Sequence, residues 1–377
     1  FILQKNYLTT EKATTVSELV PALSGLPSSA SETPFLSAQT RLLSFAPDDL
    51  LTELYQTFSL IKSPLMRFAP YIVPVDIFPT LFAATVRQRN QALNSQLRLW
   101  SIERNEEIEQ LGETVLDTIS TEPLSAEKVA AKLSPDVVKA LTQTSRGGRV
   151  THTTNVDLAL QWLIAQGTLG VSQTMPADWQ EERPLYAPLT QWYPDLDVTN
   201  LPTEAEAQAA LVRAYLAAFG PATEADISFW TGFGKSETAR ATSALSKETV
   251  LTMVQGIPGM LLLLKDQGEA LKATEVPTSP VINILPADDP FTTAHRASRT
   301  RYFTNQKLQR QVFNSSGAAK PTIVVNGQIV GVWAVEEKEI HWRQLAETDD
   351  VNFPLIQERL QQVGEFLHPD ITIHQDG

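Results

Sequence analysis

Residues 211–234, LVRAYLAAFGPATEADISFWTGFG, contain two short stretches of helical periodicity joined by a tight corner. The first stretch keeps one apolar face up to Phe219. Gly220 and the proline after it then end that helix, because glycine suits the left-handed residue beyond a helix end and proline cannot continue a helix. Thr223, with Asp226 three residues later, predicts a capping box at the start of the second helix.

The residues that follow complete a recognisable order of elements. Ser236 predicts the cap of a third helix over residues 236–246, and two strands, 250–254 and 260–265, then flank a Gly/Pro turn. Three short helices followed by a β-hairpin are typical of a winged helix-turn-helix, with Trp230 expected in its core, under the hairpin. A helical corner and hairpin that only build a core would give the same pattern.

Length and composition limit the classes of protein. The chain has 377 residues, enough for two to four domains, and is 42% hydrophobic and 19% charged. It has no cysteine, which excludes disulfides and thiolate metal sites, and its five histidines show no metal-ligand spacing. No nucleotide or flavin motif is present, so we expect neither a metal nor another cofactor. With no membrane-length apolar run and no recognisable signal peptide, we expect a cytoplasmic monomer without membrane contact.

Charge is unevenly distributed along the chain. The formal net charge of −13 argues against nucleic-acid binding by the whole surface, since affinity for phosphate comes from clustered Lys and Arg. Residues 290–335, however, contain no Asp or Glu. We predict a DNA-binding face there, the alternative being a solvated face without a partner. Its predicted contact residues are Arg296, Arg299, Arg301, Lys307 and Arg310.

A second basic segment is the short loop at residues 145–149, SRGGR. Its glycines would let the backbone approach a phosphate, and the arginine side chains suit phosphate oxygens. We therefore add Arg146 and Arg149 to the predicted DNA contacts. A surface turn with two solvated arginines is the alternative.

Element patterns predict an α+β chain of four parts. We expect a first winged-helix module over residues 1–100, a second over 101–180, a linker and third module over 181–280, and a β-rich domain over 281–377. The linker is the Pro-, Trp- and Tyr-rich stretch 175–202. The clearest hairpin signal is Asn326-Gly327, which supports a type I′ turn between strands 322–325 and 328–332.

Several of these stretches, taken in order, resemble the winged-helix DNA-binding family that includes the AlkZ and YcaQ (AlkX) DNA glycosylases. The matching segments are RAYL and FGPATEAD within 213–226, WTG at 230–232, ILPADDP at 284–290 followed by Arg299 and Arg301, and VVNGQIVGVW at 324–333. In the N-terminal part they are Gly25-Leu26, residues 34–42, Leu65-Met66-Arg67 and Ile72-Val73-Pro74.

The resemblance covers nearly the whole chain and implies three tandem winged helix-turn-helix modules in a C-shaped arrangement, plus a C-terminal β-barrel-like domain. It implies duplex DNA as the partner. The best-known bacterial members remove bulky alkylated or crosslinked bases, in repair or in self-resistance to DNA-alkylating natural products.

The region expected to hold the chemistry departs from the family pattern. The family's Gln–apolar–Gln or Gln–apolar–Asp motif follows the Gly-Leu pair, where this chain has Pro27-Ser28-Ser29. Its Arg-Gly-Thr-Leu-His stretch here is RFAPY, so that Arg67 remains while Tyr71 takes the histidine position. Under a shifted alignment, the carboxylate of Glu32 or the amide of Gln39 could take the place of the motif's polar side chains. The catalytic candidates are therefore Glu32, Arg67 and Tyr71, although a lone Glu in a Ser/Pro loop is more often solvated surface.

Three functions remain in consideration. The first is a duplex DNA-binding protein in which glycosylase chemistry is lost or altered, and the second is an active glycosylase for an unusual lesion. The third is a non-catalytic protein-interaction scaffold, because winged helices also bind proteins. The basic segment from Arg296 to Arg310 favours the first two over the third, and the altered motif favours the first over the second.

Overall fold

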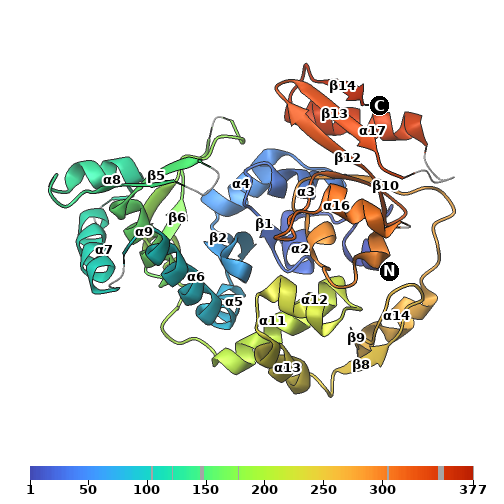
Figure 1. Cartoon of the computed structure of the whole chain (residues 1–377), viewed down its shortest axis with the longest axis horizontal. Helices are drawn as coiled ribbons and strands as arrows, with labels where there is room; N and C mark the ends of the chain where they lie inside the picture. The colour runs from blue at the N-terminus through green and yellow to red at the C-terminus, as the bar shows by residue number, and fades with distance from the viewer. Residues whose placement is uncertain are drawn as a thin grey trace. The chain divides into compact units, whose positions relative to one another are not determined.

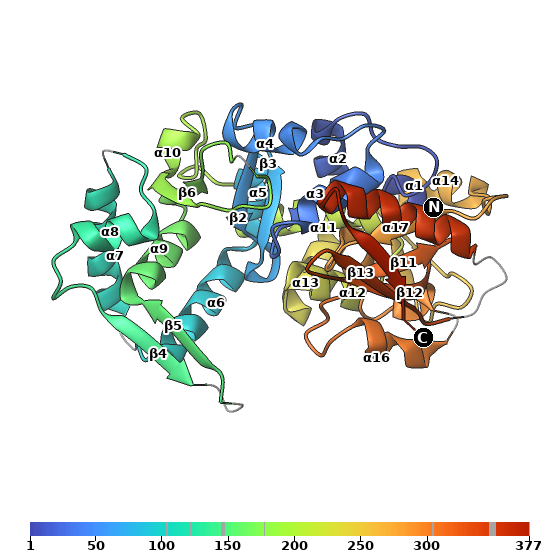
Figure 2. The same ribbon diagram turned by 90° about the horizontal axis from the view of Figure 1, so that it is seen from above.

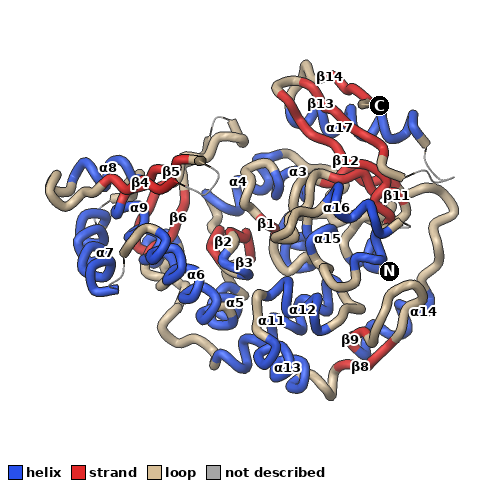
Figure 3. The backbone as a smooth tube through the Cα atoms, viewed as in Figure 1, coloured by secondary structure: helices blue, strands red, loops and turns tan. Residues whose placement is uncertain are grey.

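A computed structural model describes residues 1–102, 105–120, 122–144, 148–176, 178–303, 305–346 and 352–376. The chain divides into two compact units (Figures 1 and 3). The terminal unit comprises Phe1–Pro47 and Gln208–Gly377, and the middle unit comprises Asp48–Ala207. Helices and strands occur in both units, which confirms the α+β class. The four-part division is finer than these units and stays a prediction.

The middle unit combines a helical core with three β-hairpins, and two helices cross its boundaries. Its elements are α4 (Pro47–Tyr55), β2 (Leu60–Pro64), β3 (Pro70–Pro74), α5 (Phe78–Ala84), α6 (Val86–Leu99), α7 (Asn105–Ile119), α8 (Ala126–Lys132), β4 (Ala140–Thr144), β5 (Val150–Thr154), α9 (Asn155–Ala165), β6 (Leu169–Ser172), β7 (Leu185–Pro188), α10 (Leu189–Trp192) and the start of α11 (Glu204–Phe219). Thr85 separates α5 from α6.

Helices α7, α8 and α9 enclose the core of the middle unit. Val115 of α7, Val129 of α8 and Val156 of α9 are fully buried there. Helix α9 begins at a capping box, in which the Thr154 hydroxyl accepts the Asp157 N–H and the Asp157 carboxylate accepts the Thr154 N–H. Hairpin β6–β7 follows α9 in the chain.

Two features of the middle unit differ from expectation. The stretch 175–202, expected to be a linker, contains β7 and α10, and β7 pairs with β6. Hairpin β4–β5 was not predicted as strands. Its residues are polar and mostly solvent-exposed, so the apolar alternation that reveals a strand is missing.

The terminal unit holds the three helices and hairpin predicted around residue 220. They are α11, α12 (Glu224–Thr231), α13 (Lys235–Ala244), β8 (Thr249–Thr252) and β9 (Leu261–Leu264). The capping box of Thr223 with Asp226 is present, and α12 ends at Gly232 with a φ of 81°, a left-handed residue that glycine adopts readily.

Two predictions about how these helices end and begin were wrong. Gly220 is not left-handed; a Cβ there would lie 2.6 Å from the Leu216 carbonyl oxygen, so close approach to the preceding turn requires glycine. Ser236 does not cap α13, which begins at Lys235 after Gly234. The Glu237 carboxylate accepts the Gly234 N–H at 2.7 Å instead.

Trp230 is a core residue of this helical group. It is 3% exposed, and its ring lies 5.2 Å from the ring of Tyr215 and 5.9 Å from that of Phe219, both on α11. The burial expected from sequence is therefore confirmed, with aromatic side chains of the preceding helix as its contacts.

We expect Trp230→Ala to lower the free energy of unfolding by about 3–5 kcal/mol, because it removes a large buried aromatic side chain and leaves a cavity. Denaturant titration measures the change. Leu251→Ala is the control, since Leu251 is 62% exposed and should cost below about 0.5 kcal/mol. Equal losses in the two variants would contradict the core assignment.

The terminal unit also contains a five-stranded sheet, in the order β10-β11-β12-β13-β14. The strands are β10 (Ile282–Leu285), β11 (Thr322–Val325), β12 (Gln328–Glu336), β13 (Glu339–Gln344) and β14 (Thr372–Gln375). Helix α17 (Phe353–Leu367) packs on this sheet through Ile356 and Leu360 (Figure 2). Among the described residues β10 and β14 do not pair, so the sheet is open and the β-barrel-like closure is not confirmed.

The turn between β11 and β12 was predicted correctly. Asn326 and Gly327 have φ values of 49° and 84°, the two positive angles of a type I′ turn. The remaining elements of the terminal unit are α1 (Ile2–Lys5), α2 (Val16–Ala22), β1 (Leu26–Pro27), α3 (Thr33–Arg41), α14 (Gly268–Ala273), α15 (Pro290–Thr293) and α16 (Gln309–Val312). No helix in the described part of the chain is long and apolar enough to cross a membrane.

Candidate nucleic-acid interface and candidate catalytic loop

Pro27-Ser28-Ser29, which the family resemblance puts at the position of the catalytic motif, spans the end of β1 and the start of the loop before α3. Pro27 and Ser28 are buried, and Ser29 is exposed. Glu32 immediately precedes α3, is exposed, and accepts a hydrogen bond from the Ser31 hydroxyl at 3.0 Å. The only carboxylate of this loop is therefore a surface group.

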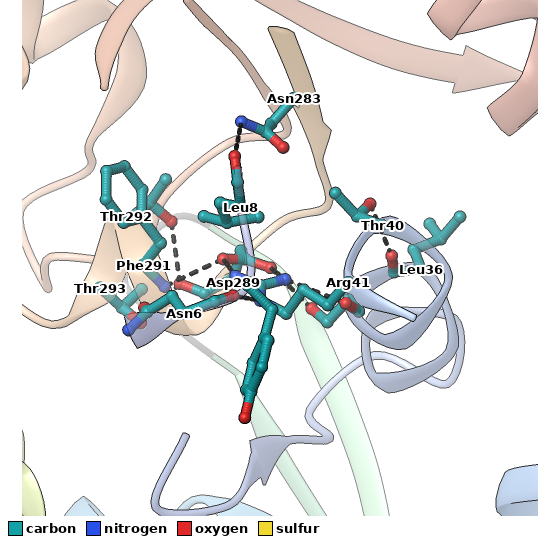
Figure 4. A network of polar contacts seen from close by, with 12 residues as sticks. Asn6, Leu8, Leu36, Thr40, Arg41, Asn283, Asp289, Phe291, Thr292 and Thr293 are labelled. Atoms are coloured by element: carbon teal, nitrogen blue, oxygen red, sulfur yellow. Dashed lines mark hydrogen bonds and ion pairs between the residues drawn. The ribbon is translucent and has the colours of Figure 1, made fainter. Parts of the chain in front are cut away.

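Helix α3 is held in place by a buried ion pair (Figure 4). The Arg41 guanidinium donates to both carboxylate oxygens of Asp289 at 2.7 and 2.8 Å, and both side chains are fully buried. The Ser37 hydroxyl donates to the same carboxylate at 2.7 Å, and Arg41 Nε donates to the Asn6 carbonyl at 3.0 Å. Asp289 is one of the two acidic residues of the ILPADDP segment, so that residue of the segment has a structural role.

A second buried carboxylate joins α12 to the following basic segment. Asp226 accepts the backbone N–H groups of Arg296, Ala297 and Ser298 at 2.7–3.1 Å, and the Ser298 hydroxyl at 2.6 Å. Burial opposes ionisation, but these hydrogen bonds together with nearby His295 hold the pKa of Asp226 below its ordinary value. The FGPATEAD segment that ends at Asp226 is thus also structural.

Two of the five basic side chains predicted to contact DNA in residues 290–335 form hydrogen bonds within the protein. Arg299 is 7% exposed; its guanidinium donates to the carbonyls of His295 and Gly317 and lies 3.5 Å from the ring centre of Phe313. Arg301 donates to the Pro221 carbonyl and the Ser298 hydroxyl. These contacts argue against both arginines as phosphate ligands, because the Nε and one terminal nitrogen of each guanidinium already donate within the protein.

The other three cations of the segment reach solvent. Arg296, Lys307 and Arg310 are exposed, as is Lys320. Arg296 donates to the Ser315 carbonyl at 3.3 Å and lies over the Phe229 ring. These contacts hold the guanidinium in position, and its charge remains accessible to solvent. These four residues form the terminal basic surface.

A second group of exposed basic residues lies in and beside hairpin β4–β5 of the middle unit, which Figure 2 shows as two paired strands. Arg149 is exposed, whereas Arg146 lies outside the described residues. Sequence reasoning missed two neighbours, Lys139 and His152, which are also exposed. The signal that could have found them is the absence of Asp and Glu from residues 137–156. Lys139, Arg149 and His152 form the hairpin basic surface.

Arg67 and Tyr71 lie in the middle unit, while Glu32 belongs to the terminal unit. Arg67 and Phe68 have φ values of 56° and 60° in the turn between β2 and β3, a left-handed conformation that is strained for non-glycine residues and is often found at functional sites. Arg67 is exposed. Tyr71 is 8% exposed and pairs with Ser63 across the hairpin. The burial of Tyr71 favours a packing role over direct contact with a substrate.

Comparison with known proteins places these features in a family. The model of the AlkZ-like DNA glycosylase family matches residues 20–358. The chain belongs to the AlkZ-like DNA glycosylase family. Among solved structures it is similar to the DNA glycosylase AlkZ of Streptomyces sahachiroi, with a TM-score of 0.77 and 17% sequence identity over 100% of this chain and 97% of that chain. A search of the curated proteins found no match.

Family membership confirms the resemblance drawn from the ordered segments. The likeness to AlkZ, at 17% identity, shows a shared fold. Asp226 and Asp289, which belong to two of the AlkZ-like segments, make buried contacts that hold parts of the fold together.

Proposed function

We propose that this AlkZ-like protein binds duplex DNA and lacks the glycosylase chemistry that the family's Gln–apolar–Gln or Gln–apolar–Asp motif supplies. The observation that carries the proposal is the composition and exposure of the loop after β1. Pro27 has no polar side chain, Ser28 is buried, and a Ser29 hydroxyl is too weak an acid or base to replace a carboxylate. The fold of a DNA glycosylase is then present without the side chains that position its water.

The proposed DNA-binding units are winged helices. Helices α11, α12 and α13 followed by hairpin β8–β9 have the required order, and α7, α8 and α9 followed by β6–β7 repeat it, with β4–β5 inserted before α9. A module within residues 1–100 would be the third. Their C-shaped arrangement stays a prediction of the family resemblance.

Exposed cations support DNA as the partner despite the net charge. The terminal basic surface and the hairpin basic surface both lie in stretches without Asp or Glu, so local positive charge is not neutralised by sequence neighbours. Lysine and arginine at such surfaces bind phosphates irrespective of sequence. We therefore expect little preference for DNA sequence.

Charge reversal tests this proposal directly. We expect Lys307→Glu/Arg310→Glu, and separately Arg149→Glu, to weaken binding to a duplex at low salt. Each lost phosphate contact should reduce the slope of log affinity against log salt by about 0.9. Fluorescence anisotropy at several NaCl concentrations measures both quantities.

The matched control is Lys338→Glu. Lys338 is 59% exposed and lies between Glu337 and Glu339, so its reversal changes the net charge as much as Arg149→Glu, and half as much as the double variant, outside both basic surfaces. It should leave the slope unchanged. A slope near zero for the unmodified protein would contradict DNA binding and favour the protein-interaction scaffold.

One observation favours a second candidate, an active glycosylase for bulky alkylated or crosslinked bases. Glu32 is an exposed carboxylate within a few residues of the family's motif position and could hold a water without a Gln partner. Its removal should then abolish excision, an outcome that would contradict the loss of chemistry proposed above.

A further inference from the structure

The terminal unit contains a cleft that the proposed DNA-binding surfaces do not include. Its volume is about 460 Å³, and it is lined by the segment before α2, the C-terminal end of α3, β10 and α17. Thr40 and Asn283, both drawn in Figure 4, belong to its wall. The polar residues that matter here are Thr10, Lys12, Gln39, Ser279, Arg359 and Gln362.

Positive charge in this cleft is not compensated. Lys12 and Arg359 line it, and none of the described lining residues is Asp or Glu. Lys12 Nζ donates to the carbonyls of Tyr7 and Thr40, at 3.2 and 2.8 Å, which are neutral acceptors and leave one N–H unused. Burial, with the nearby charges of Arg41 and Arg359, lowers the pKa of Lys12 to about 8.

A structural role for Lys12 explains only part of this arrangement. Its bond to the Thr40 carbonyl satisfies a group at the end of α3, where a cation is favourable. Arg41 behind it is neutralised by Asp289, but neither Lys12 nor Arg359 has an ion-pair partner among the described residues. An anion between the two would relieve their repulsion.

Uncharged donors lie in the same cleft. The Gln39 amide and the hydroxyls of Thr10 and Ser279 have no hydrogen-bond partner in the described part of the chain. Arg359 donates to Gln362, which fixes the guanidinium on the surface of α17. Hydroxyl, amide and cationic donors around one cavity match the several oxygens of a phosphate group.

We propose that this cleft binds a phosphate group, with Lys12 and Arg359 as the charged ligands and Gln39 as a neutral donor. A cavity of 460 Å³ falls in the range of small-molecule sites and exceeds the needs of a single phosphate, so a nucleotide can enter it. The phosphate can come from a free nucleotide or from the DNA backbone. The two sources present the same chemistry and are separated by the experiment.

The experiment compares Arg359→Gln and Lys12→Met with the unmodified chain. Calorimetry in 150 mM NaCl uses inorganic phosphate and a deoxynucleoside 5′-monophosphate, and anisotropy uses a duplex. Arg213→Gln is the control, because Arg213 is an exposed arginine of the same unit that does not line the cleft. Arg359 is exposed, so its variant should fold even if Lys12→Met does not.

We expect phosphate to bind and Arg359→Gln to weaken it at least tenfold, with Arg213→Gln unchanged. Loss of mononucleotide binding with unchanged duplex affinity assigns the site to a free nucleotide. Weaker duplex binding with a salt slope reduced by about 0.9 assigns it to the DNA backbone. If no probe binds, or if Arg359→Gln and the control behave alike with every probe, the proposal is overturned. The phosphate titration contains no DNA, so its outcome is independent of the proposed DNA binding.

Discussion

Asp289→Ala is expected to lower the free energy of unfolding by about 3–5 kcal/mol, the cost typical of removing one partner from a buried ion pair. The variant leaves the Arg41 guanidinium fully buried without its counter-charge and removes the acceptor of the Ser37 hydroxyl. It also removes the side-chain cap of α15, whose Phe291 N–H donates to Asp289 at 2.9 Å. Equilibrium denaturation in urea measures the loss.

The control for this prediction is an exposed ion pair. Glu122 and Lys132 are 59% and 45% exposed, so Glu122→Ala should cost below about 1 kcal/mol. The double variant Arg41→Met/Asp289→Leu should recover part of the loss, because it removes both charges together. A cost below about 1 kcal/mol for Asp289→Ala would mean that water reaches the pair and that it does not fix α3.

The second large effect concerns catalysis. Cleavage of an N-glycosidic bond builds positive charge on the sugar and needs a water held on its far face. General acid–base help is worth about 10²–10⁴ in rate, so excision of 7-methylguanine by this chain should be slower than that of a catalytic relative by a factor of that order. A cationic base such as 7-methylguanine is a good leaving group. Some residual excision, faster than spontaneous base loss from free DNA, is therefore compatible with this expectation.

Two variants separate lost chemistry from a relocated catalyst. Glu32→Ala should leave the slow excision rate unchanged, because an exposed carboxylate bonded only to Ser31 among the described residues has no contact that positions a water. Pro27→Gln/Ser29→Gln restores amide side chains at the motif positions and should raise the rate. Fast excision by the unmodified chain that Glu32→Ala abolishes would contradict the account and make Glu32 the catalyst.

The parts of the fold that sequence predicted are those encoded by local rules. The Thr223–Asp226 capping box and the Asn326-Gly327 turn depend on residues a few positions apart, and both form as expected. Burial of Trp230 follows from its place on an apolar helical face.

The features that sequence missed depend on distant contacts. Charge and spacing marked Arg299 as a surface cation, but the Gly317 carbonyl and the Phe313 ring that enclose it lie well along the chain. Arg41 and Asp289 are 248 residues apart, and no single sequence identifies them as partners. Hairpin β4–β5 was not predicted because strands exposed on both faces show no apolar alternation.

The candidate site was predictable to a similar degree. The family resemblance pointed to Pro27-Ser28-Ser29, and that assignment stays a prediction. Charge along the sequence pointed to Arg149, Lys307 and Arg310, which the structure leaves exposed. It placed Tyr71 among the catalytic candidates by position, whereas the structure buries that side chain in β3. The cleft at Lys12 and Arg359 was not predicted, since its walls come from four separate segments.

One measurement tests the central claim most directly: binding and excision followed in the same sample under single-turnover conditions. A labelled duplex containing one 7-methylguanine is mixed with excess unmodified protein in low salt, anisotropy reports the bound fraction, and alkali-revealed strand breaks report base loss. The account predicts that the duplex becomes saturated with protein while excision stays at least about 10²-fold slower than with a catalytic family member. Rapid base loss from the bound duplex, or no binding at any protein concentration that saturates a catalytic member, would contradict it.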